Sequence, residues 1–445
     1  MNAPTKNATA TISAGKNPVG APVSRAERVQ QIVSPGGIAA WLVEDYAVPL
    51  VAMEFSFAGG ASQDPQGKAG AGSLLAGLLD EGAGDLTAEA FHRALEDHAI
   101  RLSFSAERDE FYGHLQTLVR HSDKAFELMA LALNAPRFDA EPLERVRGQL
   151  NAALKRESRE PDAMAAQAWR RAAWPGHPYS RASRGELGEI DAVTRDDLVA
   201  LRKKMLARET LKISVVGAID AATLARHLDS LFAGLPEKAD LTPVPDIEVQ
   251  GAGRRIVVDY DVPQSNIRFG RPGIARRDPD YIPAMVVNHI LGGGSFTSRL
   301  WQEVREKRGL TYSVYSSLST ADHSPAFIGS TSTKNERAAE TLSVIETEYT
   351  RLAADGPTAE ELDKAKKYLT GSYALRFDTS TKIAGHLLQL QRESLGVDYL
   401  DRRNAEVEAV SLEDARRVAK RLIGDSRLLV AIVGRPEGVS EQSAA

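Results

Sequence analysis

The order of apolar and polar positions along the chain predicts strands in adjacent pairs, with helices placed between the pairs. Residues 38–57 and 101–117 each contain two alternating apolar segments typical of paired strands. Apolar positions spaced three and four apart predict helices near 68–80, 87–99, 122–134 and 141–173. Paired strands combined with helices indicate an α+β sandwich rather than a doubly wound parallel sheet.

An internal repeat shows that this pattern occurs twice. The segment "DYAVPLVAMEFSFAGGASQDP" (45–65) aligns without a gap with "DYDVPQSNIRFGRPGIARRDP" (259–279), and nine of the 21 positions are identical. Residues 192–217 likewise match 409–434, each with a capping Thr or Ser, an amphipathic helix and an apolar strand that ends in Gly. The fold class we expect is therefore two homologous α/β sandwich domains.

The repeat and the composition of the intervening segments divide the chain into five parts. A segment rich in Pro, Gly and charge joins the two repeats and indicates a linker. We expect a disordered lead-in at 1–24, a first domain at 25–235, the linker at 236–254, a second domain at 255–437 and a tail at 438–445.

Composition excludes several classes of function. The 445 residues are 43% hydrophobic and 26% charged, with a net charge of −5 and both signs mixed throughout, so nothing indicates a nucleic-acid partner. The sequence contains no window of about 18 apolar residues, so no membrane-spanning helix is predicted. The chain has no cysteine, which excludes disulfides, thiol nucleophiles and thiolate metal sites.

The first 24 residues are small, polar and rich in Pro and Gly, and they lack the apolar core of a signal peptide. They are compatible with a disordered lead-in, with the remnant of a removed signal or with an expression tag. A chain without cysteine suits the cytoplasm and the periplasm equally.

Common catalytic motifs are absent. No two of the nine histidines stand four apart, so the sequence predicts no helical two-histidine metal site. The chain has no G-x-S-x-G, its closest P-loop-like segment lacks the required Gly and Ser/Thr, and "LGGGSF" (291–296) fails G-x-G-x-x-G at Phe296.

One segment, "NHILGGGSFTSRLWQEVREKRGLTYSVYSSL" (288–318), is a candidate site. Arg305 lies in a predicted helix and Tyr312 begins a predicted strand, seven residues apart across a Gly309 turn. Such a pair can place a guanidinium and a phenolic hydroxyl at one point. The alternative is an ordinary exposed arginine and a tyrosine at the core edge.

The segment "LGGGSFTSRLWQEVREKRGLTYSVYSS" resembles the second-half signature of the M16 (pitrilysin, insulysin and mitochondrial processing peptidase) family, and "WPGHPYSRASRGELGEI" (174–190) and "ALRFDTS" (374–380) resemble other family segments. The resemblance spans about 30–435 and is greatest to the bacterial processing-peptidase-like (M16B) subfamily. It implies two α+β sandwich halves that close on a peptide.

Members of that family with peptidase activity carry H-x-x-E-H in the first half, where two histidines bind Zn²⁺ and the Glu activates water. The resemblance places "GAGSLLAG" (70–77) at that motif, so Ser73, Ala76 and Gly77 occupy the positions of the two histidines and the glutamate. A third ligand is expected near 153–154, and the nearest carboxylate, Glu157, is about one turn away. We therefore expect no metal on this chain.

The resemblance also implies roles for the second half. Arg305 and Tyr312 match the pair that approaches the substrate and its developing oxyanion from across the active site, and Gly292, Gly293 and Gly294 match a peptide-facing segment. We expect a non-catalytic subunit of a heterodimeric zinc metallopeptidase, inactive alone, whose partner carries an intact H-x-x-E-H with its zinc and acts on peptides.

Two other hypotheses are open. The chain could serve only as a structural or peptide-binding scaffold, or the charged strand 105–115 could support unrelated chemistry in the first half. Paired bacterial relatives are commonly exported, which favours a periplasmic over a cytoplasmic location.

Overall fold

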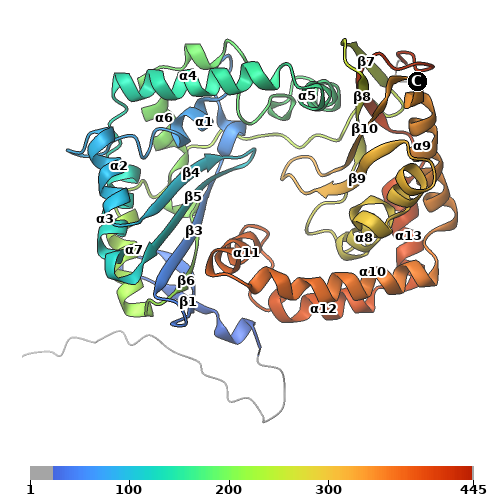
Figure 1. Ribbon diagram of the computed structural model, residues 1–445. Helices are drawn as coiled ribbons and strands as arrows, with labels where there is room; N and C mark the ends of the chain where they lie inside the picture. The colour runs from blue at the N-terminus through green and yellow to red at the C-terminus, as the bar shows by residue number, and fades with distance from the viewer. Residues whose placement is uncertain (1–23, 443–445) are drawn as a thin grey trace, which may run out of the picture.

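The computed structural model describes residues 24–442, which form two halves, each built on a mixed sheet with helices packed against it (Figure 1). The expected lead-in lies outside the described residues except for Ser24, as do the last three residues of the expected tail.

The first half contains a six-stranded sheet with the order β1-β2-β6-β3-β5-β4. Strands β2 and β6 are parallel and the other neighbours are antiparallel. The strands are β1 (Gln30–Val33), β2 (Ala39–Glu44), β3 (Leu50–Ala58), β4 (Arg101–Ala106), β5 (Glu110–Leu118) and β6 (Lys212–Gly217).

The second half repeats this topology with one strand fewer. Its order is β7-β11-β8-β10-β9, and β7 and β11 form the only parallel pair among the described strands of this sheet. The strands are β7 (Arg255–Asp259), β8 (Gln264–Pro272), β9 (Thr311–Ser319), β10 (Ala326–Lys334) and β11 (Leu429–Gly434). The order and directions match β2-β6-β3-β5-β4, so the predicted duplicated α+β fold is confirmed.

The helices of the first half are α1 (Ala71–Ala76), α2 (Ala88–Asp97), α3 (Ser122–Asn134), α4 (Ala140–Glu157), α5 (Pro161–Ala173), α6 (Arg195–Met205) and α7 (Ala221–Phe232). Those of the second half are α8 (Tyr281–Asn288), α9 (Ala338–Asp355), α10 (Ala359–Ser372), α11 (Ser380–Arg392), α12 (Tyr399–Ala409) and α13 (Leu412–Ile423). The two repeated helices, α6 and α13, both begin with the predicted capping Thr or Ser, each in a complete capping box.

Two of the predicted helices were wrong in extent. The helix expected over 141–173 is two helices, because Glu160 is extended (φ −86°, ψ 117°) and Pro161 starts α5. The helix expected over 68–80 is only the six-residue α1. Gly70 precedes it with a φ of 102°, and a Cβ there would lie 2.6 Å from Ile190 Cγ1, so the chain turns sharply into the helix.

Each half contributes one helix to the sheet of the other half. Helix α5 of the first half packs on β8 and β11, and α11 of the second half packs on β3 and β6 (Figure 1). Trp169 of α5 is buried there and donates its indole N–H to the Leu429 carbonyl oxygen at 3.0 Å. In α11, Leu387 is buried against Val43 and Val216 of the first sheet. We call α5 and α11 the exchanged helices.

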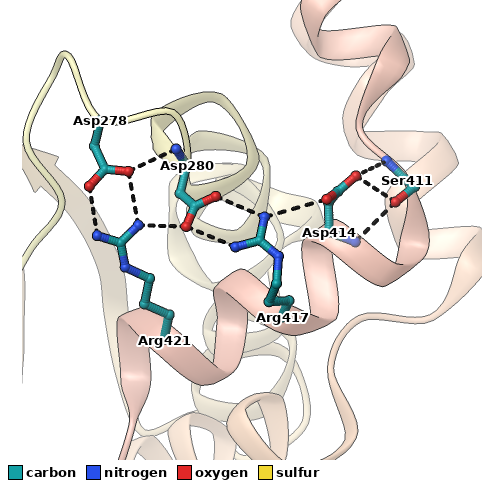
Figure 2. A network of polar contacts seen from close by, with 6 residues as sticks. All are labelled: Asp278, Asp280, Ser411, Asp414, Arg417 and Arg421. Carbon is teal, nitrogen blue, oxygen red and sulfur yellow. Dashed lines mark hydrogen bonds and ion pairs between the residues drawn. The ribbon is translucent and has the colours of Figure 1, made fainter.

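A network of ion pairs fixes the start of α8 against α13 (Figure 2). Asp280 accepts two hydrogen bonds from Arg417, at 2.8 and 2.9 Å, and a further bond from Arg421, which also binds Asp278. These arginines hold the pKa of Asp280 at about 2, below its ordinary 3.8. The network holds the helix that leads into the glycine run at 292–294.

Within residues 24–442, none of the helices has the length and apolar character needed to cross a bilayer.

Candidate functional site

The helix α1, where the resemblance placed the degenerate metal positions, forms one wall of a cavity. Ser73, Ala76 and Gly77 all line this cavity of about 490 Å³, which we call the α1 cavity. The Ser73 hydroxyl donates to the carbonyl oxygen of Ser183 at 3.2 Å. The loop 182–184 therefore closes the opposite wall.

Asp64 holds the start of α1 in place. Its carboxylate accepts hydrogen bonds from the backbone N–H groups of Gly70 and Gly72, both at 2.7 Å. Burial raises the pKa of Asp64 to about 6, although these two bonds and the charge of Arg181 act in the opposite direction. A buried carboxylate thus organises the segment that in this chain carries no metal ligand.

Glu157, the carboxylate nearest the expected third-ligand position, does reach the α1 cavity. It lies at the end of α4 and forms an ion pair with Arg184 from the closing loop. The cavity therefore places an arginine against the one carboxylate that the sequence singled out.

These residues do not fit a zinc ion. A serine, an alanine and a glycine stand at the three motif positions, and Glu157 is already neutralised by a guanidinium. Throughout residues 24–442, no three His, Asp or Glu side chains are grouped as a metal would require. His114 instead bonds Glu54 at 2.6 Å, and the His121 ring contacts His98.

Arg305 and Tyr312 lie together in the second half. Both line a cavity of about 480 Å³ between the helical segment Trp301–Glu306 and strands β9 and β10. Tyr312 is the second residue of β9 and is 80% exposed. The guanidinium of Arg305 lies 4.2 Å from the centre of the Trp301 ring and 3.1 Å from Glu306 Oε1. Both residues therefore line one cavity, whereas the convergence of their polar groups on one point and the role of the pair stay predictions.

The segment that carries Arg305 has wide, π-type helical turns at His289–Gly293 and again at Trp301–Glu306. Gly292 is buried, and a Cβ there would lie 2.5 Å from Ser316 Oγ on β9. Gly292 therefore permits close packing on the strand that begins near Tyr312. Gly293 is exposed and Gly294 half-buried, so the expected peptide contact of the run stays a prediction.

The α1 cavity also contains features that the sequence reasoning missed. Arg108, from the turn between β4 and β5, and Arg170 of α5 both line it. Arg108 lies in the charged segment 105–115 noted in the sequence, but Arg170 had no signal, because a single arginine on an amphipathic helix is ordinarily a solvated residue. Only the tertiary contacts of α5 bring it to α1.

A duplicated α+β sandwich with serine, alanine and glycine at the motif positions of α1 defines the class, a peptidase-like chain whose first half lacks the H-x-x-E-H residues. Two sequence models of one family match it: "Insulinase (Peptidase family M16)" over residues 42–186 and "Peptidase M16 inactive domain" over residues 192–369. The chain belongs to the M16 family and is of its inactive type.

Named relatives agree with the family assignment. The chain is 28% identical to the "Non-peptidase homolog YmxG" of Helicobacter pylori over 339 residues, 76% of this chain and 78% of that protein. It is 25% identical to the "Probable mitochondrial-processing peptidase subunit beta" of Schizosaccharomyces pombe, covering 83% of each chain. The crystal structure of a peptidase M16 inactive domain from Pseudomonas fluorescens superposes with a TM-score of 0.85 at 26% identity, covering 94% of this chain and all of that one.

Proposed function

We propose that this chain is the non-catalytic subunit of a two-chain M16 zinc peptidase and donates Arg305 and Tyr312 to the active site of its partner. The observation that carries the proposal is the contrast between the two cavities. In the α1 cavity the three motif positions carry no metal ligand and Glu157 is paired with Arg184, whereas Arg305 and the highly exposed Tyr312 line one open cavity of the second half. A relative named as a subunit of a processing peptidase supports a partner of this kind.

The chemistry assigned to the pair is stabilisation of charge. A guanidinium and a phenolic hydroxyl are both hydrogen-bond donors, and donors aimed at a carbonyl oxygen favour the negative charge that develops when a peptide bond is attacked. The partner, with an intact H-x-x-E-H, supplies the zinc and the activated water. Arg305 and Tyr312 then orient and stabilise the substrate carbonyl. The location that we propose for this two-chain peptidase is the periplasm.

The test is reconstitution with an M16 chain that bears H-x-x-E-H. Hydrolysis of a fluorogenic peptide by the mixture should exceed that of either chain alone, and Arg305→Ala or Tyr312→Phe should each lower kcat/KM by about 10²-fold. Tyr46→Phe and Arg435→Ala, at exposed residues elsewhere, are the matched controls and should leave kcat/KM unchanged. Equal activity of the four variants would refute donation by the pair.

A scaffold role is the second candidate, and one observation favours it. Arg305 already has partners within its own chain, Glu306 and the Trp301 ring. If these contacts persist in the complex, the chain binds peptide or partner without contributing to the reaction. Full activity of a partner chain assayed without this chain would support that role.

A further inference from the structure

The α1 cavity contains a positive charge without a counter-ion. Within residues 24–442, the guanidinium of Arg170 makes no hydrogen bond and no ion pair, and its Nε is buried without a partner. Burying a charged donor without a partner is costly, and an opposite charge placed beside it would offset that cost. An anion brought by a ligand would do so.

Neighbouring charges add to this positive potential rather than cancel it. Burial and then the charge of Arg108 lower the pKa of Arg170 to about 10. Arg268 acts in the same direction and Glu186 in the opposite one. Arg268 projects from β8 of the second half, the strand on which α5 packs, and its side chain has no ion pair in the described part of the chain. Arg268 therefore adds a positive charge from the second half to the electrostatic surroundings of Arg170.

The carboxylates around Arg170 are mostly engaged by other groups. Glu186 accepts from Arg171 at 3.0 Å and from Gln167 at 2.8 Å, and Glu157 is held by Arg184. Glu107 also lines the cavity, but its side chain is exposed to solvent. Arg108 has partners of its own, since it lies over the Tyr179 ring and donates to the Tyr179 carbonyl oxygen at 2.9 Å. Arg170 is the charge that stays uncompensated.

The small residues of α1 leave room for a ligand. With Ser73, Ala76 and Gly77 on its wall, the α1 cavity measures about 490 Å³, within the range of ordinary ligand sites. A planar guanidinium offers two parallel N–H donors that suit a carboxylate.

We propose that the α1 cavity binds the carboxylate of a peptide, with Arg170 as the principal contact and Arg268 as a supporting charge. The position that holds a metal in zinc-bearing relatives thereby becomes, in this chain, an anchor for an acidic peptide. The choice of a peptide as the bearer of the carboxylate rests on the proposed function, whereas the preference for an anion rests on the cavity alone.

The test is calorimetric titration of the full chain, without any partner, with four probes. They are a blocked pentapeptide with a central Glu among alanines, the same peptide with Gln, an all-alanine pentapeptide with a free C-terminus, and inorganic phosphate. We expect the Glu peptide or the free C-terminus to bind at least tenfold more tightly than the Gln peptide, with affinity that falls as salt rises. Which of the two binds identifies the source of the carboxylate.

Variants of the chain then assign the contact. Arg170→Gln should weaken the carboxylate peptide at least tenfold, Arg268→Gln severalfold, and Arg170→Lys less than Arg170→Gln. Arg156→Gln is the matched control, because Arg156 is 70% exposed on α4 and pairs with Glu160. Thermal melts verify that each variant is folded.

Equal affinity for the Glu and Gln peptides, or unchanged affinity in Arg170→Gln, would overturn the inference. Binding of phosphate alone would overturn the peptide as ligand. These titrations measure binding and no catalysis. A failure of the role proposed for Arg305 and Tyr312 would therefore leave their outcomes unchanged.

Discussion

Glu157 and Arg184 form an ion pair across the α1 cavity, and Glu157 is the carboxylate nearest the position, about one turn away, where the resemblance places a third metal ligand. The guanidinium supplies the positive charge that a metal would otherwise supply to that carboxylate. Loss of the metal ligands on α1 and neutralisation of Glu157 are therefore consistent with each other.

This ion pair predicts how a metal site could be rebuilt. The triple variant Ser73→His, Ala76→Glu and Gly77→His restores the motif but leaves Glu157 bound to Arg184. Adding Arg184→Ala should raise zinc affinity at least tenfold over the triple variant, because a free carboxylate then completes the ligand set. Calorimetric zinc titration measures the change. Adding Arg156→Ala to the triple variant is the control, and equal gains from the two additions would contradict the prediction.

The uncompensated charge of Arg170 predicts a stabilising substitution. Arg170→Met removes a buried donor without a partner and keeps much of the side-chain volume, so we expect the free energy of unfolding to rise by about 1 kcal/mol. A change of that size corresponds to a thermal midpoint about 2 °C higher. Differential scanning calorimetry measures it, with Arg156→Gln as the unchanged control. A lower midpoint for Arg170→Met would show that the arginine stabilises the free chain.

The network at the start of α8 predicts an acid-dependent contribution to stability. Asp280 has a pKa of about 2 in the folded chain against an ordinary 3.8, so its stabilisation is complete above about pH 4 and is lost as the pH falls through 2. Asp280→Asn should cost about 2 kcal/mol at neutral pH, because bonds to two arginines are lost or weakened. The gap in thermal midpoint between the two proteins should be constant from pH 7 to 4 and shrink below pH 4.

Asp363→Asn is the control for that series. Asp363 is 59% exposed and pairs with Lys367 on the same helix, so its replacement should change the midpoint little at any pH. A gap for Asp280→Asn that stayed constant down to pH 2 would contradict the assignment of the stabilisation to its carboxylate.

The first of the exchanged helices predicts graded effects at Trp169. Trp169→Ala should lower the free energy of unfolding by about 3–5 kcal/mol, because it opens a large cavity between α5 and the second sheet. Trp169→Phe keeps most of the packing but removes the indole N–H bond to the Leu429 carbonyl oxygen, so its cost should be about 1 kcal/mol. Thermal unfolding measures both, with Trp301→Phe as a control far from this contact. Similar losses for Ala and Phe would attribute the effect to the hydrogen bond alone.

The duplicated topology was predictable because periodicity and the internal repeat report on local structure and on homology between the halves. The break between α4 and α5 was also marked in the sequence, since Pro161 lacks the backbone N–H that a continuous helix needs at that position. The exchanged helices were not predictable. An amphipathic pattern shows that α5 has an apolar face, but it does not say which sheet that face covers.

The candidate site likewise has one part that the sequence could indicate and one part that it could not. The spacing of Arg305 and Tyr312 across a glycine turn allowed an approach of the pair to be considered from sequence, because the two elements are adjacent, and both residues line one cavity. The arginines that line the α1 cavity come from a hairpin turn, from α5 and from the loop 182–184, so only the assembled fold brings them together.

The exchanged helices also determine how the molecule can be deformed. Moving the two halves apart would withdraw Trp169 from the second sheet and Leu387 from the first, exposing apolar surface at both places. The linker between α7 and β7 therefore does not act as a free hinge. Mechanically the two halves are one body held at two points, so any relative movement of the two sheets must bend or repack α5 and α11 rather than swing about the linker.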